Sequence, residues 1–254
     1  MIKLFAKLKA KWQKLTARPE KVDIIYPISW ETMTEQDFKN VCIILTRQLD
    51  RHQTLFLCLC KLADIYPDNA SKYDKKSLKK GSPFIINGKP YVISTSVISE
   101  ACDQMAFIFD KIGLPPSPFK NVDRMLYGVS FETFYEVDSY IMRSIAEGNE
   151  GYLKHAAKAL TNGAKRKLLP WERKALIIWW NGVKEFLKGK YPHVLTSDGG
   201  GITDKSQADI LHDLLGCLND NKPQENDRIL KCEVHSVLYS LDKIYKNAKH
   251  QSAQ

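Results

Sequence analysis

The chain has 254 residues, of which 44% are hydrophobic and 26% are charged, and its formal net charge at pH 7 is +9. These values are typical of a globular protein that buries a substantial core. No stretch reaches the ~18 to 20 apolar residues of a membrane span, and lysines interrupt every N-terminal apolar run, so neither a membrane span nor export is expected.

Residues 1–22 carry most of the charge excess. They contain seven lysines and arginines against one glutamate, which gives +6. Apolar residues recur there at three- and four-residue steps, at Phe5, Leu8, Trp12 and Leu15, which predicts a basic amphipathic helix. The favoured interpretations are a helix that docks in a protein groove or folds onto its own body. Contact with an anionic membrane surface or with nucleic acid phosphates is the alternative.

Residues 23–113 are predicted to form a helical subdomain with one hairpin. Thr34 followed by Asp37 predicts the start of a helix over 35–48, and a second helix is expected from about 52 to 65. The lysine-rich stretch 68–82 is predicted to be an exposed loop. Apolar runs on both sides of Asn87-Gly88 predict a β-hairpin over 84–93, which must pack on the helices or on another chain.

Residues 114–129 form a proline-bearing connector, and 130–254 are predicted to be a C-terminal helical subdomain. Ser130 is the expected start of its first helix, and a proline opens a central buried helix over 171–187. Trp179 and Trp180 diverge by about 100° on that helix, so one of them is expected to face another subunit. The glycines at 199–201 favour a flexible link over a phosphate-binding loop.

The last helix is predicted from about 227 to 246. Its apolar residues alternate at four and three positions and form a seam that suits a partner helix: Leu230, Val234, Val237, Leu241 and Ile244. In total, about nine helices and one small β-hairpin are expected, so the predicted fold is mainly α, an irregular multi-helix bundle.

The cysteines and histidines give no strong chemical motif. The six cysteines lie mostly within apolar helical patterns, which indicates reduced, buried thiols in a reducing cytoplasm: Cys42, Cys58, Cys60, Cys102, Cys217 and Cys232. Cys232 and His235 share a helix face and, with His212 and Cys217, could supply zinc ligands, but ordinary packing is favoured because His212 and Cys217 face different ways. No catalytic residues, metal or cofactor are therefore predicted, and the chain is not expected to be an enzyme.

Several short tracts resemble tail-morphogenesis proteins of phages and prophages of Bacteroidota. These tracts span most of residues 29–245 and are Ser29-Trp30-Glu31-Thr32-Met33-Thr34, the Asn87-Gly88 hairpin, Tyr127-Gly128-Val129-Ser130-Phe131, Leu169-Pro170-Trp171-Glu172-Arg173-Lys174, and Asn226-Asp227-Arg228-Ile229-Leu230 followed by His235 and Leu238. The resemblance implies a helical tail-assembly chaperone or a neck or tail component and brings no catalytic residues. The basic N-terminus departs from that family.

The sequence thus predicts a cytoplasmic, non-enzymatic protein that acts through contacts with other subunits, either phage tail or assembly proteins or copies of itself. Association with the virion is left open. The predicted contact residues are Phe5, Leu8, Trp12, Trp180, Leu230, Val234, Val237, Leu241 and Ile244. The alternative is a nucleic-acid-binding module that uses Lys7, Lys11, Lys14, Arg18, Lys75, Lys76, Lys79 and Lys80.

Overall fold

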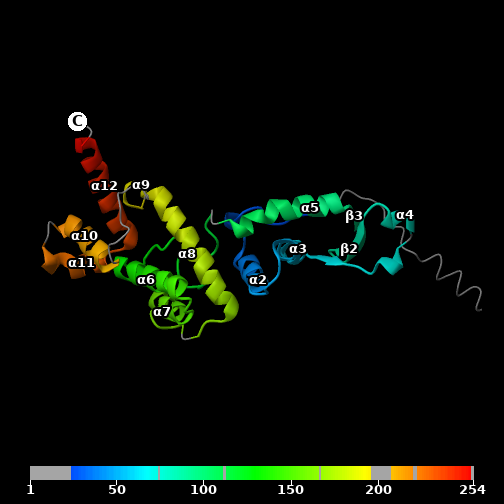
Figure 1. Cartoon of the computed structure of the whole chain (residues 1–254), viewed down its shortest axis with the longest axis horizontal. Coiled ribbons are helices and arrows are strands. Elements are labelled where there is room, and N and C mark those ends of the chain that lie inside the picture. Colours follow the sequence, from blue (N-terminus) through cyan, green and yellow to red (C-terminus); the bar gives the residue numbers. More distant parts are fainter. Residues whose placement is uncertain are drawn as a thin grey trace, which may run out of the picture. The chain divides into compact units, whose positions relative to one another are not determined.

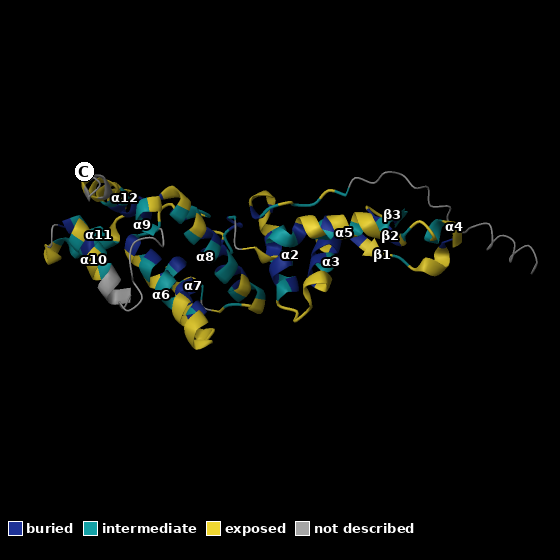
Figure 2. Ribbon diagram, turned by 45° about the horizontal axis from the view of Figure 1, so that its top comes forward, coloured by how far each residue is buried: buried dark blue, intermediate teal, exposed yellow. Residues whose placement is uncertain are grey.

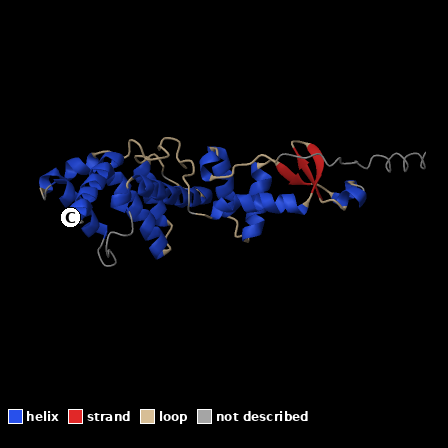
Figure 3. Ribbon diagram, turned by 90° about the horizontal axis from the view of Figure 1, so that it is seen from above, coloured by secondary structure: helices blue, strands red, loops and turns tan. Residues whose placement is uncertain are grey.

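The computed structural model describes residues 24–73, 75–110, 113–165, 167–195, 207–219 and 222–252. Within these ranges the chain forms eleven α-helices and one small three-stranded antiparallel sheet, so the predicted mainly α fold is confirmed (Figure 3). The chain divides into two compact units, Met1–Asp110 and Lys111–Gln254, here called unit 1 and unit 2. The predicted helix of residues 1–22 and the predicted link at 196–203 lie outside the described residues.

Unit 1 contains four described α-helices. They are α2 (Glu35–Leu45), α3 (Arg51–Leu62), α4 (Lys75–Leu78) and α5 (Thr95–Gln104), with 3-10 helices at Trp30–Thr32, Ala70–Lys72 and Met105–Phe109. Thr34 accepts a hydrogen bond from the Asp37 N–H, which confirms the predicted start of α2. Helix α5 begins after Ser94, whose side chain accepts a hydrogen bond from the Val97 N–H. Helices α2 and α3 lie side by side (Figures 1 and 2).

The predicted hairpin forms part of a three-stranded sheet. Strands β2 (Ser82–Ile86) and β3 (Lys89–Ile93) are joined by Asn87 and Gly88, which both have positive φ. The difference from prediction is β1 (Ile65–Pro67), which pairs antiparallel with β2 and ends the preceding helix at Leu62. Packing on α3 through Phe56 and on α5 through Ile98 covers the sheet's small core, so the hairpin is supported within its own unit.

Each outer strand of this sheet has a proline at a position where the backbone N–H of another residue would point away from β2. The Asp68 N–H donates to the Pro83 carbonyl, so residues 66 and 68 direct their backbone groups toward β2 and Pro67 faces outward. The two-residue turn between β2 and β3 sets which β3 residues direct their backbone groups toward β2. Pro90 is one of the residues whose backbone faces away from β2. Both edges therefore lack a donor that a further strand would need.

The secondary-structure elements described in unit 2 are all helices, and one isolated bridge joins Ser130 and Glu233. Its α-helices are α6 (Phe131–Glu147), α7 (Gly151–Leu160), α8 (Pro170–Lys190), α9 (Pro192–Leu195), α10 (Gln207–Asn219), α11 (Asn226–Lys231) and α12 (Val234–Ser252), with a 3-10 helix at Pro223–Glu225. The stretch 114–129 has no regular structure, but Leu114, Val122 and Leu126 are buried in the unit's core.

Helix α8 is the central buried helix, as predicted, but both of its adjacent tryptophans are fully buried within the unit. The Trp179 indole N–H donates to the Arg124 carbonyl at 3.1 Å, and that of Trp180 donates to Asp138 Oδ1 at 2.9 Å. The expectation that one indole faces another subunit is therefore wrong. The irregular stretch covers one side of α8 and α6 covers the other.

The predicted last helix is interrupted between α11 and α12. Cys232 is extended, its carbonyl accepts the Phe131 N–H at 2.8 Å, and the Val234 N–H donates to the Val129 carbonyl at 2.9 Å. These bonds join the break to the start of α6. Helix α12 then packs against α6, α9 and α10, so most of the predicted seam is covered within unit 2.

Candidate functional site

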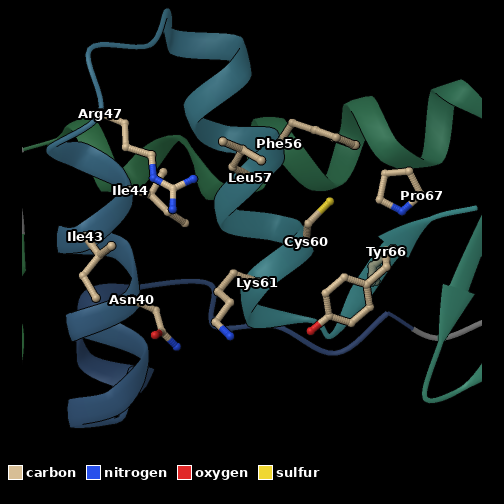
Figure 4. A pocket seen from close by; sticks show the side chains of 11 residues that line it. Asn40, Ile43, Ile44, Arg47, Phe56, Leu57, Cys60, Lys61, Tyr66 and Pro67 are labelled. Carbon is tan, nitrogen blue, oxygen red and sulfur yellow. The ribbon is translucent and has the colours of Figure 1, made fainter.

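A solvent-facing pocket lies in unit 1 between α2, α3 and β1 (Figure 4). Its volume is about 350 Å³. The lining residues are Asn40, Ile43, Ile44, Arg47, Phe56, Leu57, Cys60, Lys61, Ile65, Tyr66 and Pro67. We call this site the α2–α3 pocket.

The lining follows helical spacing. On α2 and the turn after it, Asn40, Ile43, Ile44 and Arg47 are three, four and seven residues apart, so they share one face. Helix α3 has two apolar faces. One buries Leu55 and Leu59 in the core, and the other presents Phe56 and Leu57, which are only partly buried. The apolar part of the lining thus combines partly buried side chains, such as Phe56 and Leu57, with core residues such as Ile44 and Ile65.

Two groups in the pocket, the Cys60 thiol and the Tyr66 phenol, have raised pKa values, which favour their neutral forms. Burial, with a smaller effect of Cys102, raises the pKa of the Cys60 thiol to about 11, so the thiolate that would act as a nucleophile is scarce near neutral pH. A hydrogen bond to Asp64 raises the pKa of the Tyr66 phenol. The geometry therefore suits binding through apolar contact better than covalent or acid–base chemistry.

Two cations border this apolar surface. Arg47 and Lys61 are exposed, and Figure 4 shows them separated along the pocket, with Arg47 beside Ile44 and Lys61 beside Asn40. Among the described residues, no carboxylate forms an ion pair with either of them. The electrostatic character of the rim is therefore positive.

The predicted contact residues lie in different places. Trp180, Val234 and Leu241 are fully buried and Val237 is 4% exposed, so none of these four presents a surface for a partner. Leu230 is half-buried on α11, and Ile244 is 39% exposed on α12. Phe5, Leu8 and Trp12 lie outside the described residues.

The predicted basic residues are also divided. Lys75, Lys76, Lys79 and Lys80 are exposed on α4 and the turn that follows it, near the end of the sheet where β2 begins. Lys7, Lys11, Lys14 and Arg18 lie outside the described residues.

The cysteine and histidine residues considered as zinc ligands do not converge. His235 is buried, where Nε2 lies 2.8 Å from the Met125 carbonyl, Nδ1 lies 2.9 Å from the Tyr191 hydroxyl, and the ring stacks on Tyr127. Cys232, Cys217 and His212 are exposed. In the part of the chain that the structure describes, no three histidine, cysteine or acidic residues are grouped as a metal site requires.

The sequence predicted the helices α2 and α3 but not the pocket beside them. The sequence did contain a signal for the pocket: α3 has apolar residues on two faces, whereas a helix that packs on one side needs only one apolar face. Closing the pocket also requires β1, whose pairing with β2 was not predicted.

None of the helices in the described ranges combines the length and the apolar character needed to cross a lipid bilayer. Comparisons of the chain with protein-family models, with curated protein sequences and with solved structures found no match.

Proposed function

We propose that this chain is a non-enzymatic binding protein that holds a segment of another polypeptide in the α2–α3 pocket. The resemblance of its tracts to phage and prophage tail-morphogenesis proteins favours a role as a tail-assembly chaperone or as a neck or tail component. Such a protein would act in the bacterial cytoplasm and, as a tail component, would stay with the virion.

The observation that carries this proposal is the partly exposed apolar lining of the pocket. Ile43, Phe56 and Leu57 are each only partly buried, and Tyr66 is 48% exposed. Contiguous apolar surface that remains in contact with water is a characteristic of sites that bind other molecules. Covering it releases about 25 cal/mol for each Å² of apolar area, so a partner side chain seated there gains free energy without any reaction.

The chemistry of the lining also supports binding over catalysis. A covalent mechanism through Cys60 would need the thiolate, and a pKa of about 11 keeps that thiol protonated near neutral pH.

Site-specific cross-linking tests the proposal. A photoreactive side chain placed at Tyr66, in cells that make the full chain, is expected to give one discrete adduct with another polypeptide. The matched control is the same side chain at Val97, which is 42% exposed on α5 and does not line the pocket. The adduct is expected to disappear in Leu57→Asp. Equal adducts at both positions, or turnover of a substrate that depends on a pocket residue, would contradict the proposal.

Genomic context tests the phage role separately. Genes for tail morphogenesis are expected to flank the coding sequence. A different, consistent neighbourhood would remove the phage assignment while leaving the binding function open to the cross-linking result.

A nucleic-acid-binding module is the second candidate, and the exposure of Lys75, Lys79 and Lys80 favours it. Affinity for DNA or RNA should then fall steeply as salt rises, because bound phosphates release counterions. Replacing these three lysines with glutamate should weaken binding to all sequences alike. A weak response to salt, or none, would remove this candidate.

A further inference from the structure

We infer that the segment bound by the α2–α3 pocket is an acidic amphipathic helix of another protein, with carboxylates on both sides of its apolar stripe. This inference rests on the proposed function and specifies the chemistry of the partner. It follows from the backbone at the pocket's edge, from the charge of its rim and from the charge of the chain's own N-terminus.

The backbone at the edge disfavours an added strand. Binding by strand addition needs outward N–H and C=O groups on the edge strand. On β1 the outward position at 67 is a proline, which has no N–H to donate, and the strand is only three residues long. Because α2 and α3 form the main walls, a helix that inserts apolar side chains between them fits this surface better.

The positive charge at the rim of the α2–α3 pocket favours a negatively charged partner. Arg47 and Lys61 are exposed, and no described carboxylate pairs with either. Asp64, which accepts a hydrogen bond from Tyr66, is not among the residues that line the pocket. A partner carboxylate on each side of an apolar stripe can therefore pair with a rim cation while the stripe covers Ile43 and Leu57.

The chain's own N-terminal segment is a poor match for this rim. Residues 1–22 have an apolar stripe of suitable spacing, but they carry a net +6. Their lysines would meet Arg47 and Lys61, and like charges brought together weaken binding. This segment supplies a useful probe, because its apolar stripe can be kept while its charge is reversed.

Two labelled peptides test the inference against the full-length chain. One has the sequence of residues 1–22, and in the other the seven basic residues are replaced by glutamate. Fluorescence anisotropy is expected to show that the glutamate peptide binds more tightly, by at least about threefold, because each exposed ion pair contributes a factor of about 1.4 to 5. In Arg47→Glu/Lys61→Glu this preference should reverse. In Lys154→Glu/Lys158→Glu, which changes the net charge equally at two exposed residues of α7 that do not line the pocket, it should persist.

The outcomes separate this inference from the proposed function. Equal binding of both peptides, abolished by Leu57→Asp, would leave the pocket as a polypeptide site and overturn the acidic partner. Tighter binding of the native peptide would identify the chain's own N-terminus as the occupant and also overturn it. If oligothymidylate competes with the peptides, Arg47 and Lys61 bind the phosphates of a nucleic acid rather than the carboxylates of a protein. Binding that survives both Leu57→Asp and Tyr66→Ala, two variants with different effects on folding, would overturn the pocket itself.

Discussion

The Tyr191 hydroxyl lies 2.9 Å from Nδ1 of His235, although 44 residues separate the two in the chain. The other ring nitrogen, Nε2, lies 2.8 Å from the Met125 carbonyl, which can only accept, so Nε2–H donates to it. The buried imidazole thereby links the end of α8, the start of α12 and the irregular stretch 114–129.

Replacing His235 with alanine should lower the free energy of unfolding by about 1 to 3 kcal/mol, because the Tyr191 hydroxyl and the Met125 carbonyl lose a partner in the interior. The control is His212→Ala on α10, an exposed position where a change within about 0.5 kcal/mol is expected. Urea denaturation of both variants measures the difference. Equal stability of the two variants would show that the buried bonds contribute nothing.

Replacing Gly182 with alanine should destabilise unit 2. An added Cβ would lie 2.6 Å from the Gly113 carbonyl oxygen and 2.7 Å from Cδ of Pro115, and neither can move freely. We expect a loss of about 1 to 3 kcal/mol, as for overpacking elsewhere. Gly189→Ala, on the same helix, meets nothing within 4 Å and should be neutral or stabilise by up to about 1 kcal/mol. Thermal or urea unfolding compares the pair, and equal effects would refute the close approach.

Thiol labelling should divide the cysteines by burial. Cys217 and Cys232 are exposed and should react first with a maleimide or with Ellman's reagent. Cys58 is fully buried, and burial raises its thiol pKa to about 12; that of Cys60 is raised to about 11. At pH 8 only about one Cys60 thiol in a thousand is then ionised, so its reaction should be slow until denaturant is added. Mass spectrometry of digests assigns each site. Early labelling of Cys58 would contradict the fold of unit 1.

Stability should decrease at alkaline pH in part because of Tyr73. Burial and a hydrogen bond to Asp68 raise the pKa of its phenol from 10.0 to about 12. The contribution of Tyr73 to the free energy of unfolding is complete below pH 10, where the phenol is protonated in the unfolded chain as well. This contribution is lost as pH rises from 10 toward 12. In Tyr73→Phe, the free energy of unfolding should depend less on pH in this window than in the parent chain. Parallel pH profiles for the two would show that the phenol is not buried.

Local features of the sequence determined where several elements begin and turn. Thr34 and Ser130 start α2 and α6 because their side chains accept a backbone N–H within the same turn. Asn87 and Gly88 adopt the positive φ that a two-residue hairpin requires. Each of these outcomes depends on residues within a few positions of one another, so composition and spacing were sufficient to predict them.

Tertiary structure alone decided which apolar surfaces are covered. Trp180 and the Val234 to Leu241 part of the seam were predicted to meet a partner, but neighbours distant in sequence bury them within unit 2. The α2–α3 pocket, in contrast, becomes a site only because β1 pairs with a strand some twenty residues away and completes its wall. The periodicity of a helix specifies an apolar face but not what lies against it, since that contact depends on the path of the rest of the chain.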